Sequence, residues 1–296
     1  MSEELERVEE RLQSIEGVQP ILEAQRTISL GGWRMALDRV EAARQFDARL
    51  AGIIPVLQAA GGAIRPRPGA RPGQIVVLAV GSERGLCGRF NQVVAQEAAA
   101  HAGRLVDQGA LVRPVAWGTR VHTILERRDE ARAWKLLPAP GVLPPFSQAA
   151  DLVAEWLAGQ AAGTLDGVDL VINTYRGGAR YELAVERLLP VELPASQDPG
   201  EQWPPVIVET DPVRLWARVV EQWVASSLYR LLLSSAAAEY SARYQLMEAA
   251  AGNAQRMVDD LRQTLRMALQ QSITREVQDL SAGAGLLRTR RKTEEE

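Results

Sequence analysis

Several residue types are scarce in this chain of 296 residues, and each scarcity excludes a class of site. The single cysteine, Cys87, excludes an internal disulfide and cannot form a metal site alone, which fits a reducing compartment. The two histidines, His101 and His122, stand in no pattern with carboxylates that would indicate a catalytic or metal centre. A formal net charge of −3 gives no basic surface for nucleic acid. We therefore expect no catalytic site, metal or cofactor, and no nucleic-acid partner.

Long apolar runs are also missing. No uninterrupted run reaches the ~18 apolar residues that a membrane span requires. The first residues, MSEELERVEERLQ, are acidic where a secretory signal is basic, so we expect no export and a cytoplasmic location. An apolar content of 46% with 24% charged residues is typical of a globular protein with ample material for a core.

The stretch from Ser234 to Leu287 organises the rest of the chain, because its apolar residues return every three or four positions without a proline. Asp211 followed by Pro212 is typical of a helix start. A helix from about Asp211 to Leu280 would be roughly 100 Å long and would need a partner along its length. The predicted seam of this coiled coil consists of Met247, Ala250, Ala254, Met257, Leu261, Leu265, Ala268, Ile273, Val277 and Leu280.

The first segment, residues 1–60, supplies that partner. Its apolar residues recur at helical spacing from Leu5 to Leu57, and as a helix it would span about 80 Å, enough to lie antiparallel along the C-terminal helix. Pro20, Gly31 and Gly32 weaken a helix, so we expect a kink or local fraying near them.

The middle of the chain alternates between strand and helix patterns and is bounded by two linkers rich in proline and glycine, Gly61–Gly73 and Ala195–Pro205. This alternation predicts a Rossmann-like α/β domain inserted between the two long helices. The predicted divisions are 1–60 for the N-terminal coiled-coil helix, 74–208 for the α/β domain, 209–287 for the C-terminal coiled-coil helix and 288–296 for a charged tail. The predicted strands are Gln74–Ser82, Leu111–Gly118, Asp169–Gly177 and Tyr181–Pro190, and the predicted helices are Asn91–Asp107, Thr119–Arg128 and Pro145–Ala158.

A glycine-rich turn, Gly81–Asn91, follows the first predicted strand, where a phosphate could bind. Its glycine spacing fits neither dinucleotide nor P-loop fingerprints, and it contains no lysine. Cys87 within it could be a reactive thiol at a helix start, but the sequence favours a small buried residue.

Two stretches resemble the gamma subunit of F-type ATP synthases. The turn is similar to the motif S-D-R-G-L-C-G-x-F-N, with Glu83 in place of the aspartate. Its matching residues are Ser82, Arg84, Gly85, Leu86, Cys87, Gly88, Phe90 and Asn91. The C-terminal helix matches that family at Ala242, Arg243, Met247, Ala250, Asn253, Ala254, Asp259, Asp260, Leu261, Gln270, Ile273, Thr274, Glu276, Asp279, Gly283 and Ala284.

The resemblance implies a rotating shaft that hydrolyses nothing itself. It implies coupling between rotation of a membrane c-type ring, driven by protons or sodium ions, and conformational change in a ring of catalytic and non-catalytic subunits. An epsilon-type subunit is a further implied partner, and the implied location is peripheral, on the cytoplasmic face of the plasma membrane. The implied partner contacts are Arg243, Asp259, Asp260, Gln270, Thr274 and Glu276.

The first ~60 residues resemble that family poorly. They read P-I-L-E-A-Q from Pro20 to Gln25 where the family has a run like K-I-T-K-A-M, and the first 16 residues hold six Glu against two Arg. Leu269 replaces a typical arginine, and the chain continues past Gly285. Two alternatives therefore stay open. One is a gamma-like paralogue that acts in assembly or regulation, or in a variant ATPase. The other is a stand-alone α/β enzyme or nucleotide-binding protein with a dimerisation coil.

Overall fold

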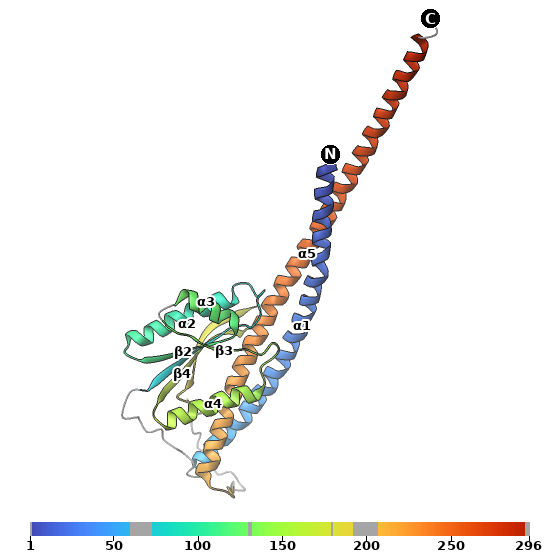
Figure 1. The fold of residues 1–296 in the computed structure, drawn as a ribbon. Coiled ribbons are helices and arrows are strands. Elements are labelled where there is room, and N and C mark those ends of the chain that lie inside the picture. The colour runs from blue at the N-terminus through green and yellow to red at the C-terminus, as the bar shows by residue number, and fades with distance from the viewer. Residues whose placement is uncertain (1, 60–72, 130–131, 179, 192–206, 294–296) are drawn as a thin grey trace. The chain divides into compact units, whose positions relative to one another are not determined.

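The computed structural model describes residues 2–59, 73–129, 132–178, 180–191 and 207–293, with side chains from residue 5 to residue 281. The chain divides into two compact units. The helix-pair unit consists of residues 1–26 and 247–296, and the α/β unit consists of residues 27–246. The two long helices, α1 (Ser2–Ala59) and α5 (Pro212–Thr293), each contribute to both units (Figure 1).

The long helices begin and continue as their sequences allow. Asp211 caps α5, because its Oδ1 accepts a hydrogen bond from the Val213 N–H at 3.0 Å and Pro212 needs no N–H partner in the first turn. The expected fraying of α1 is wrong, since the helix runs unbroken through Pro20, Gly31 and Gly32. At Gly32 the missing side chain leaves room for the ring of Tyr240 on α5. The helix α5 also continues to Thr293, past the predicted end near Leu280.

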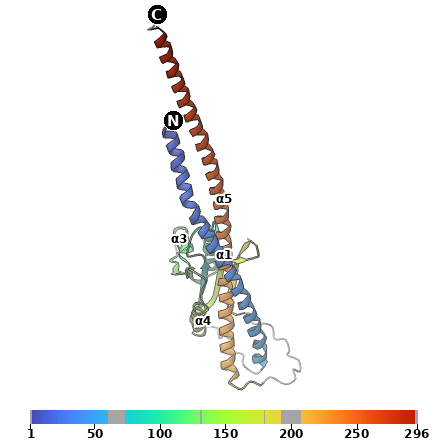
Figure 2. The same cartoon turned by 90° about the vertical axis from the view of Figure 1, so that its right-hand side faces the viewer.

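The helix-pair unit is an antiparallel coiled coil, as predicted. Gln19 Nε2 donates to Gln255 Oε1 at 2.6 Å, and Arg262 Nη2 donates to Glu16 Oε1 at 2.6 Å, so numbers fall along α1 as they rise along α5. Figure 2 shows the two helices side by side. Buried or half-buried residues of α5 follow a strict heptad of alternating three- and four-residue steps: Met247, Ala251, Ala254, Val258, Leu261, Leu265 and Ala268.

The predicted seam is therefore correct at five positions and displaced at others. Met257 is 40% exposed, whereas its neighbour Val258 is 1% exposed. Ala251 is buried in place of the predicted Ala250, which is only half-buried. Ile273, Val277 and Leu280 are exposed. A seam with a period of 3.5 residues places Val258 against the partner helix. The prediction chose Met257 instead because that residue is larger and also apolar.

The α/β unit contains a five-stranded sheet in the order β3-β2-β1-β4-β5. The pairs β1–β2, β1–β4 and β2–β3 are parallel, and β4–β5 is antiparallel. The Rossmann-like prediction is thus confirmed, although β3 had not been predicted from the sequence. The strands are β1 (Gln74–Val80), β2 (Leu111–Trp117), β3 (Lys135–Leu137), β4 (Leu165–Tyr175) and β5 (Tyr181–Leu189).

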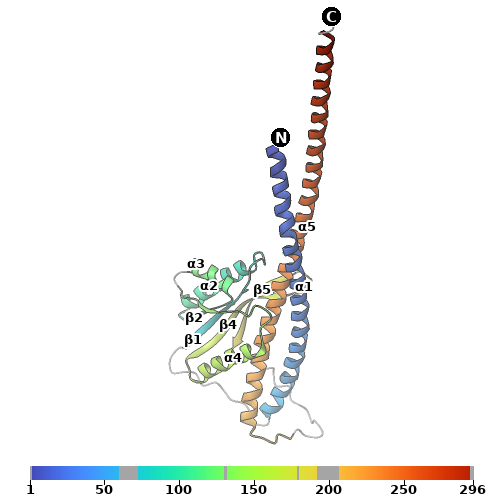
Figure 3. The same ribbon diagram turned by 45° about the vertical axis from the view of Figure 1, so that its right-hand side comes forward.

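Both faces of the sheet are covered, which explains the continuous apolar run of β1. Val77 and Ala79 pack under α2 (Phe90–Asp107) and α3 (Thr119–Arg128). Val76, Leu78 and Val80 pack on the other face, in a cluster with residues of α4 (Phe146–Ala161) and α5 (Figure 3). A strand buried on both faces needs apolar residues at successive positions, and β1 has them from Ile75 to Val80.

The linker predictions lie outside the described residues, apart from Gly73, whose N–H donates to Asp166 Oδ2 at 2.7 Å. The four-part division of the chain stays a prediction. Among the described residues, no helix combines the length and apolar character needed to cross a membrane.

Candidate functional site

Five of the six predicted contact residues are exposed on α5 within the helix-pair unit. Gln270, Thr274 and Glu276 lie near its exposed end, and the Thr274 hydroxyl donates to the Gln270 carbonyl at 2.8 Å. Asp259 accepts a hydrogen bond from Gln255 at 3.0 Å, and Asp260 is exposed beside it. Their side chains are available to a partner, and their role in binding stays a prediction.

Large apolar side chains are exposed around the same residues. In the register set by Gln19–Gln255 and Glu16–Arg262, the first residues of α1 lie opposite the region of Ile273, so α5 continues without its partner (Figures 1 and 3). The exposed fractions are 50% for Met267, 43% for Leu269, 61% for Ile273, 58% for Val277 and 69% for Leu280. Exposed large apolar side chains gathered in this way indicate a surface that another protein covers.

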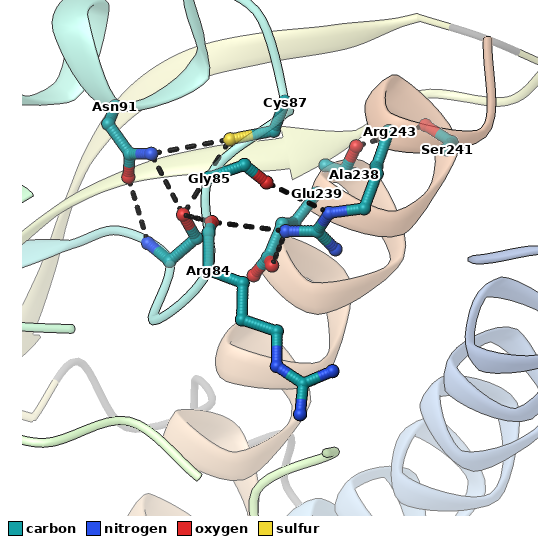
Figure 4. A network of polar contacts seen from close by, with 9 residues as sticks. Arg84, Gly85, Cys87, Asn91, Ala238, Glu239, Ser241 and Arg243 are labelled. Atoms are coloured by element: carbon teal, nitrogen blue, oxygen red, sulfur yellow. Dashed lines mark hydrogen bonds and ion pairs between the residues drawn. The ribbon is translucent and has the colours of Figure 1, made fainter. Parts of the chain in front are cut away.

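Arg243 differs from the other five, because it is only 5% exposed. Its guanidinium donates to the carbonyls of Arg84 and Gly85 and pairs with Glu239, all within the α/β unit. Figure 4 shows these contacts. Its role as a partner contact stays a prediction, but the structure gives it an internal role that the sequence reasoning did not foresee.

The glycine-rich turn is held by its own side chains. Asn91 Oδ1 accepts the Ser82 N–H at 2.8 Å, while Asn91 Nδ2 donates to Ser82 Oγ at 2.8 Å and to Cys87 Sγ at 3.3 Å. Leu86 and Gly88 have φ of 63° and 61°, which turn the chain sharply. Cys87 is 3% exposed and burial raises its pKa, so the prediction of a small buried residue is confirmed.

Glu83 fixes the start of α3. Its carboxylate accepts hydrogen bonds from the N–H and hydroxyl of Thr119, at 3.0 and 2.6 Å, and from the Ala139 N–H at 3.2 Å. Burial raises the pKa of Glu83, but these bonds and the nearby Arg120 outweigh burial and lower it below its usual range. Glu83 therefore caps the start of α3 and also holds the loop at Ala139, so its role is structural.

A cluster around Asp169 was missed by the sequence reasoning. Asp169 is 2% exposed and accepts hydrogen bonds from Arg187 at 2.7 and 2.9 Å and from His101 Nε2 at 2.8 Å. Burial raises its pKa, yet the bonds from Arg187 and His101 bring it below its usual value. An aspartate inside an apolar strand is the sequence feature that indicates such a cluster. A carboxylate buried in a strand needs hydrogen-bond or ion-pair partners. Among the described residues, no group of three His, Cys, Asp or Glu is placed to hold a metal.

These features define a class of protein: one with a long antiparallel helix pair, an α/β domain inserted in the sequence between the two helices, and exposed apolar side chains near the end of α5. A family model described as ATP synthase matches residues 4–287. The chain belongs to the ATP synthase gamma chain family. The match begins at residue 4 and so includes most of the first 60 residues, where the sequence alone suggested only a poor resemblance.

Relatives support the same assignment. The ATP synthase gamma chain of Desulforamulus reducens is 30% identical over 281 residues, which cover 94% of this chain and 96% of that one. The gamma chain of Acidithiobacillus ferrooxidans is 28% identical over 281 residues, with 93% of this chain and 96% of that one covered. A chain of the Euglena gracilis mitochondrial ATP synthase, solved as its OSCP/F1/c-ring assembly, has the same fold, with a TM-score of 0.62 and 14% identity. The alignment covers 97% of this chain and 95% of that one.

Proposed function

We propose that this chain is the central shaft of an F-type ATP synthase, and that it couples rotation of a membrane ring to conformational change in catalytic subunits. Family membership supports the proposal. The observation that carries it is the end of α5 beyond the start of α1, where the large apolar side chains of Ile273, Val277 and Leu280 are exposed. A lone apolar helix end has the form that an encircling ring of subunits would cover.

The mechanism is mechanical. An antiparallel helix pair has no rotational symmetry, so it presents a different surface in each direction. A catalytic subunit that contacts one face is biased toward one conformation, and its neighbours toward others, through differential contacts. Rotation of the helix pair then changes which conformation each catalytic subunit favours. The nucleotide chemistry belongs to the surrounding subunits.

The resemblance to the gamma subunit supports an assignment of a partner to each part of the chain. Gln270, Thr274 and Glu276 contact the ring of catalytic and non-catalytic subunits, because they share the exposed end of α5 with the apolar residues. Asp259 and Asp260 form a second polar contact with that ring. The α/β domain binds the membrane c-type ring and an epsilon-type subunit, at the cytoplasmic face of the plasma membrane.

The acidic start of α1 requires matching partners. Glu16 is satisfied within the chain by Arg262, but Glu6, Glu9 and Glu10 are exposed. Exposed carboxylates on a rotating shaft favour basic residues on the surrounding subunits that face them. Like charges there would weaken binding, so charge complementarity distinguishes the right partner from a wrong one. The catalytic subunits of the same organism should therefore present basic residues toward this part of α1.

Reconstitution tests the proposal. The chain is mixed with the catalytic and non-catalytic subunits of its own organism, and ATP hydrolysis is measured in the assembled peak after size exclusion. We expect a stoichiometric complex whose hydrolysis falls on Gln270→Ala and on truncation after Gln270. The matched control is Gln263→Ala, an exposed glutamine on the paired part of α5, which should retain hydrolysis. Exclusion of this chain from the ring, with a second gamma-like chain admitted, would favour the paralogue instead.

A further inference from the structure

Arg243 is the residue of α5 that grips the glycine-rich turn Gly81–Asn91 of the α/β domain. We infer that this grip is a torque-bearing joint, through which force on the α/β domain reaches α5. The inference rests on the proposed function as a shaft. It assigns to Arg243 a positioning role inside the rotor, separate from the contact with a partner that the sequence suggested.

The grip is formed by one guanidinium with three acceptors. Arg243 Nε donates to the Gly85 carbonyl at 3.1 Å, and Nη2 donates to the Arg84 carbonyl at 3.2 Å and to Glu239 Oε1 at 2.5 Å. In Figure 4 the group lies between the turn and the preceding helical turn of α5. A planar fork with several fixed donors resists rotation better than a point charge on a flexible stem.

Apolar packing and one backbone bond support the same joint. Cys87 and Phe90 of the turn region form a buried cluster with Ala238 of α5. The Tyr175 N–H at the end of β4 donates to Ser234 Oγ of α5 at 3.1 Å. The turn is therefore packed against α5 over more than one helical turn, and Arg243 closes the end of this contact.

The turn cannot hold this position by its own secondary structure. Residues 81–89 lie between β1 and α2 in irregular conformation, and Leu86 has a positive φ. Burial raises the pKa of Glu239 above its usual value, although Arg243 acts against that rise. Removing Arg243 would thus free the Gly85 carbonyl, leave the Arg84 carbonyl with only the Ser82 hydroxyl as its donor, and leave the largely buried Glu239 carboxyl group without its partner. The turn would therefore open more often.

Arg230 provides a matched control on the same helix. Its Nε donates to Asp47 Oδ2 of α1 at 2.8 Å, so it also forms an ion pair between elements of the α/β unit. It joins α5 to α1 and has no bond to the turn among the contacts of the described residues. Replacing either arginine should lower the stability of the α/β unit. Only replacement of Arg243 should loosen the contact between the turn and α5.

Tryptic cleavage of the full chain tests whether the joint exists. The turn contains its own cleavage sites after Arg84 and Arg89, and mass spectrometry measures the cutting rate at each. Arg243→Ala should accelerate cutting there by about tenfold or more, and Arg230→Ala should leave the rate near that of the unmodified chain. Arg243→Lys, which keeps the charge without the fork, should also accelerate cutting and serves if the alanine variant fails to fold. Equal rates in the Arg243 variants and the unmodified chain would overturn the joint.

Ion pumping by the assembled synthase in vesicles, measured for both protons and sodium ions, tests whether the joint bears torque. We expect Arg243→Ala to lower the number of ions pumped per ATP hydrolysed by about twofold or more, with hydrolysis retained and Arg230→Ala unchanged. An unchanged ratio in Arg243→Ala, or an equal loss in Arg230→Ala, would overturn the torque-bearing role. If the unmodified chain does not assemble at all, the proposed function fails and the torque-bearing role fails with it, while the tryptic result still decides whether the grip exists.

Discussion

Arg187 of β5 and Asp169 of β4 are partners in the antiparallel ladder, and they form a two-pronged ion pair inside the edge of the sheet. Arg187 Nε lies 2.7 Å from Asp169 Oδ1, and its Nη2 lies 2.9 Å from Oδ2. His101 on α2 reaches the same carboxylate at 2.8 Å. One buried carboxylate therefore ties an edge strand and a helix to the sheet interior.

Asp169→Asn should destabilise the chain by about 2 kcal/mol at neutral pH, because Arg187 and His101 lose a charged acceptor. The pKa of Asp169 is lower in the folded chain than its ordinary 3.8, so the carboxylate stabilises the fold above that pH. This stabilisation is lost as pH falls through the folded pKa. Urea unfolding should thus show a constant gap between the two proteins near pH 6 and a narrowing gap below about pH 4.

Asp151→Asn is the control, since Asp151 is an exposed residue of α4. It should unfold like the unmodified chain at every pH. A gap for Asp169→Asn that stays the same down to pH 2 would contradict the assignment of this carboxylate as ionised and bonded.

Gly32→Ala and Gly31→Ala should change stability in opposite directions. A Cβ at Gly32 would lie 2.6 Å from Cε1 of the Tyr240 ring, whereas a Cβ at Gly31 meets nothing within 4 Å. Alanine is a better helix former than glycine by about 1 kcal/mol, so Gly31→Ala should stabilise the chain by up to that amount. Gly32→Ala must displace the ring and should cost about 1–3 kcal/mol. Thermal unfolding of the two variants measures the contrast, and two shifts of the same sign would argue against the close packing of Gly32 on Tyr240.

Cys87 should resist alkylation in the folded chain. The thiol is 3% exposed, and burial raises its pKa, so both access and thiolate content are low. Iodoacetamide at pH 8 should modify Cys87 slowly in buffer and rapidly in urea, as followed by mass spectrometry. Fast, complete labelling without denaturant would show that the turn is open.

The sequence predicted the elements whose pattern is local. The apolar run of β1 requires two covered faces, the Asp211–Pro212 pair marks a helix start, and the periodicity of both termini requires a long pair. Each of these depends on residues within a few positions of one another. The three-residue strand β3 lacked such a signal, because a run of three residues has no measurable period.

The contacts of the site could not be predicted in the same way. Arg243 meets Gly85 across more than 150 residues, and Asp169 meets His101 from another element, so neither pairing leaves a periodic trace. The close packing of Gly32 against the Tyr240 ring likewise joins residues that are far apart in the sequence. Propensity gives a weak expectation that such tertiary contacts override. The family resemblance supplied the fold and the class of partner, but it assigned Arg243 to an outer surface where the structure places it inside.

The seam of the helix pair gives the last prediction. Val258 is 1% exposed and Met257 is 40% exposed, although the sequence placed Met257 in the seam. Val258→Ala removes buried methyl groups and should cost about 1–2 kcal/mol, whereas Met257→Ala should change stability by less than about 0.5 kcal/mol. Hydrogen exchange of the backbone amides along residues 247–268, read by mass spectrometry, reports on this unit separately from the α/β unit. Faster exchange in Val258→Ala with normal exchange in Met257→Ala is the expected result. The reverse order would mean that the coiled coil is rotated by one residue, with Met257 facing α1.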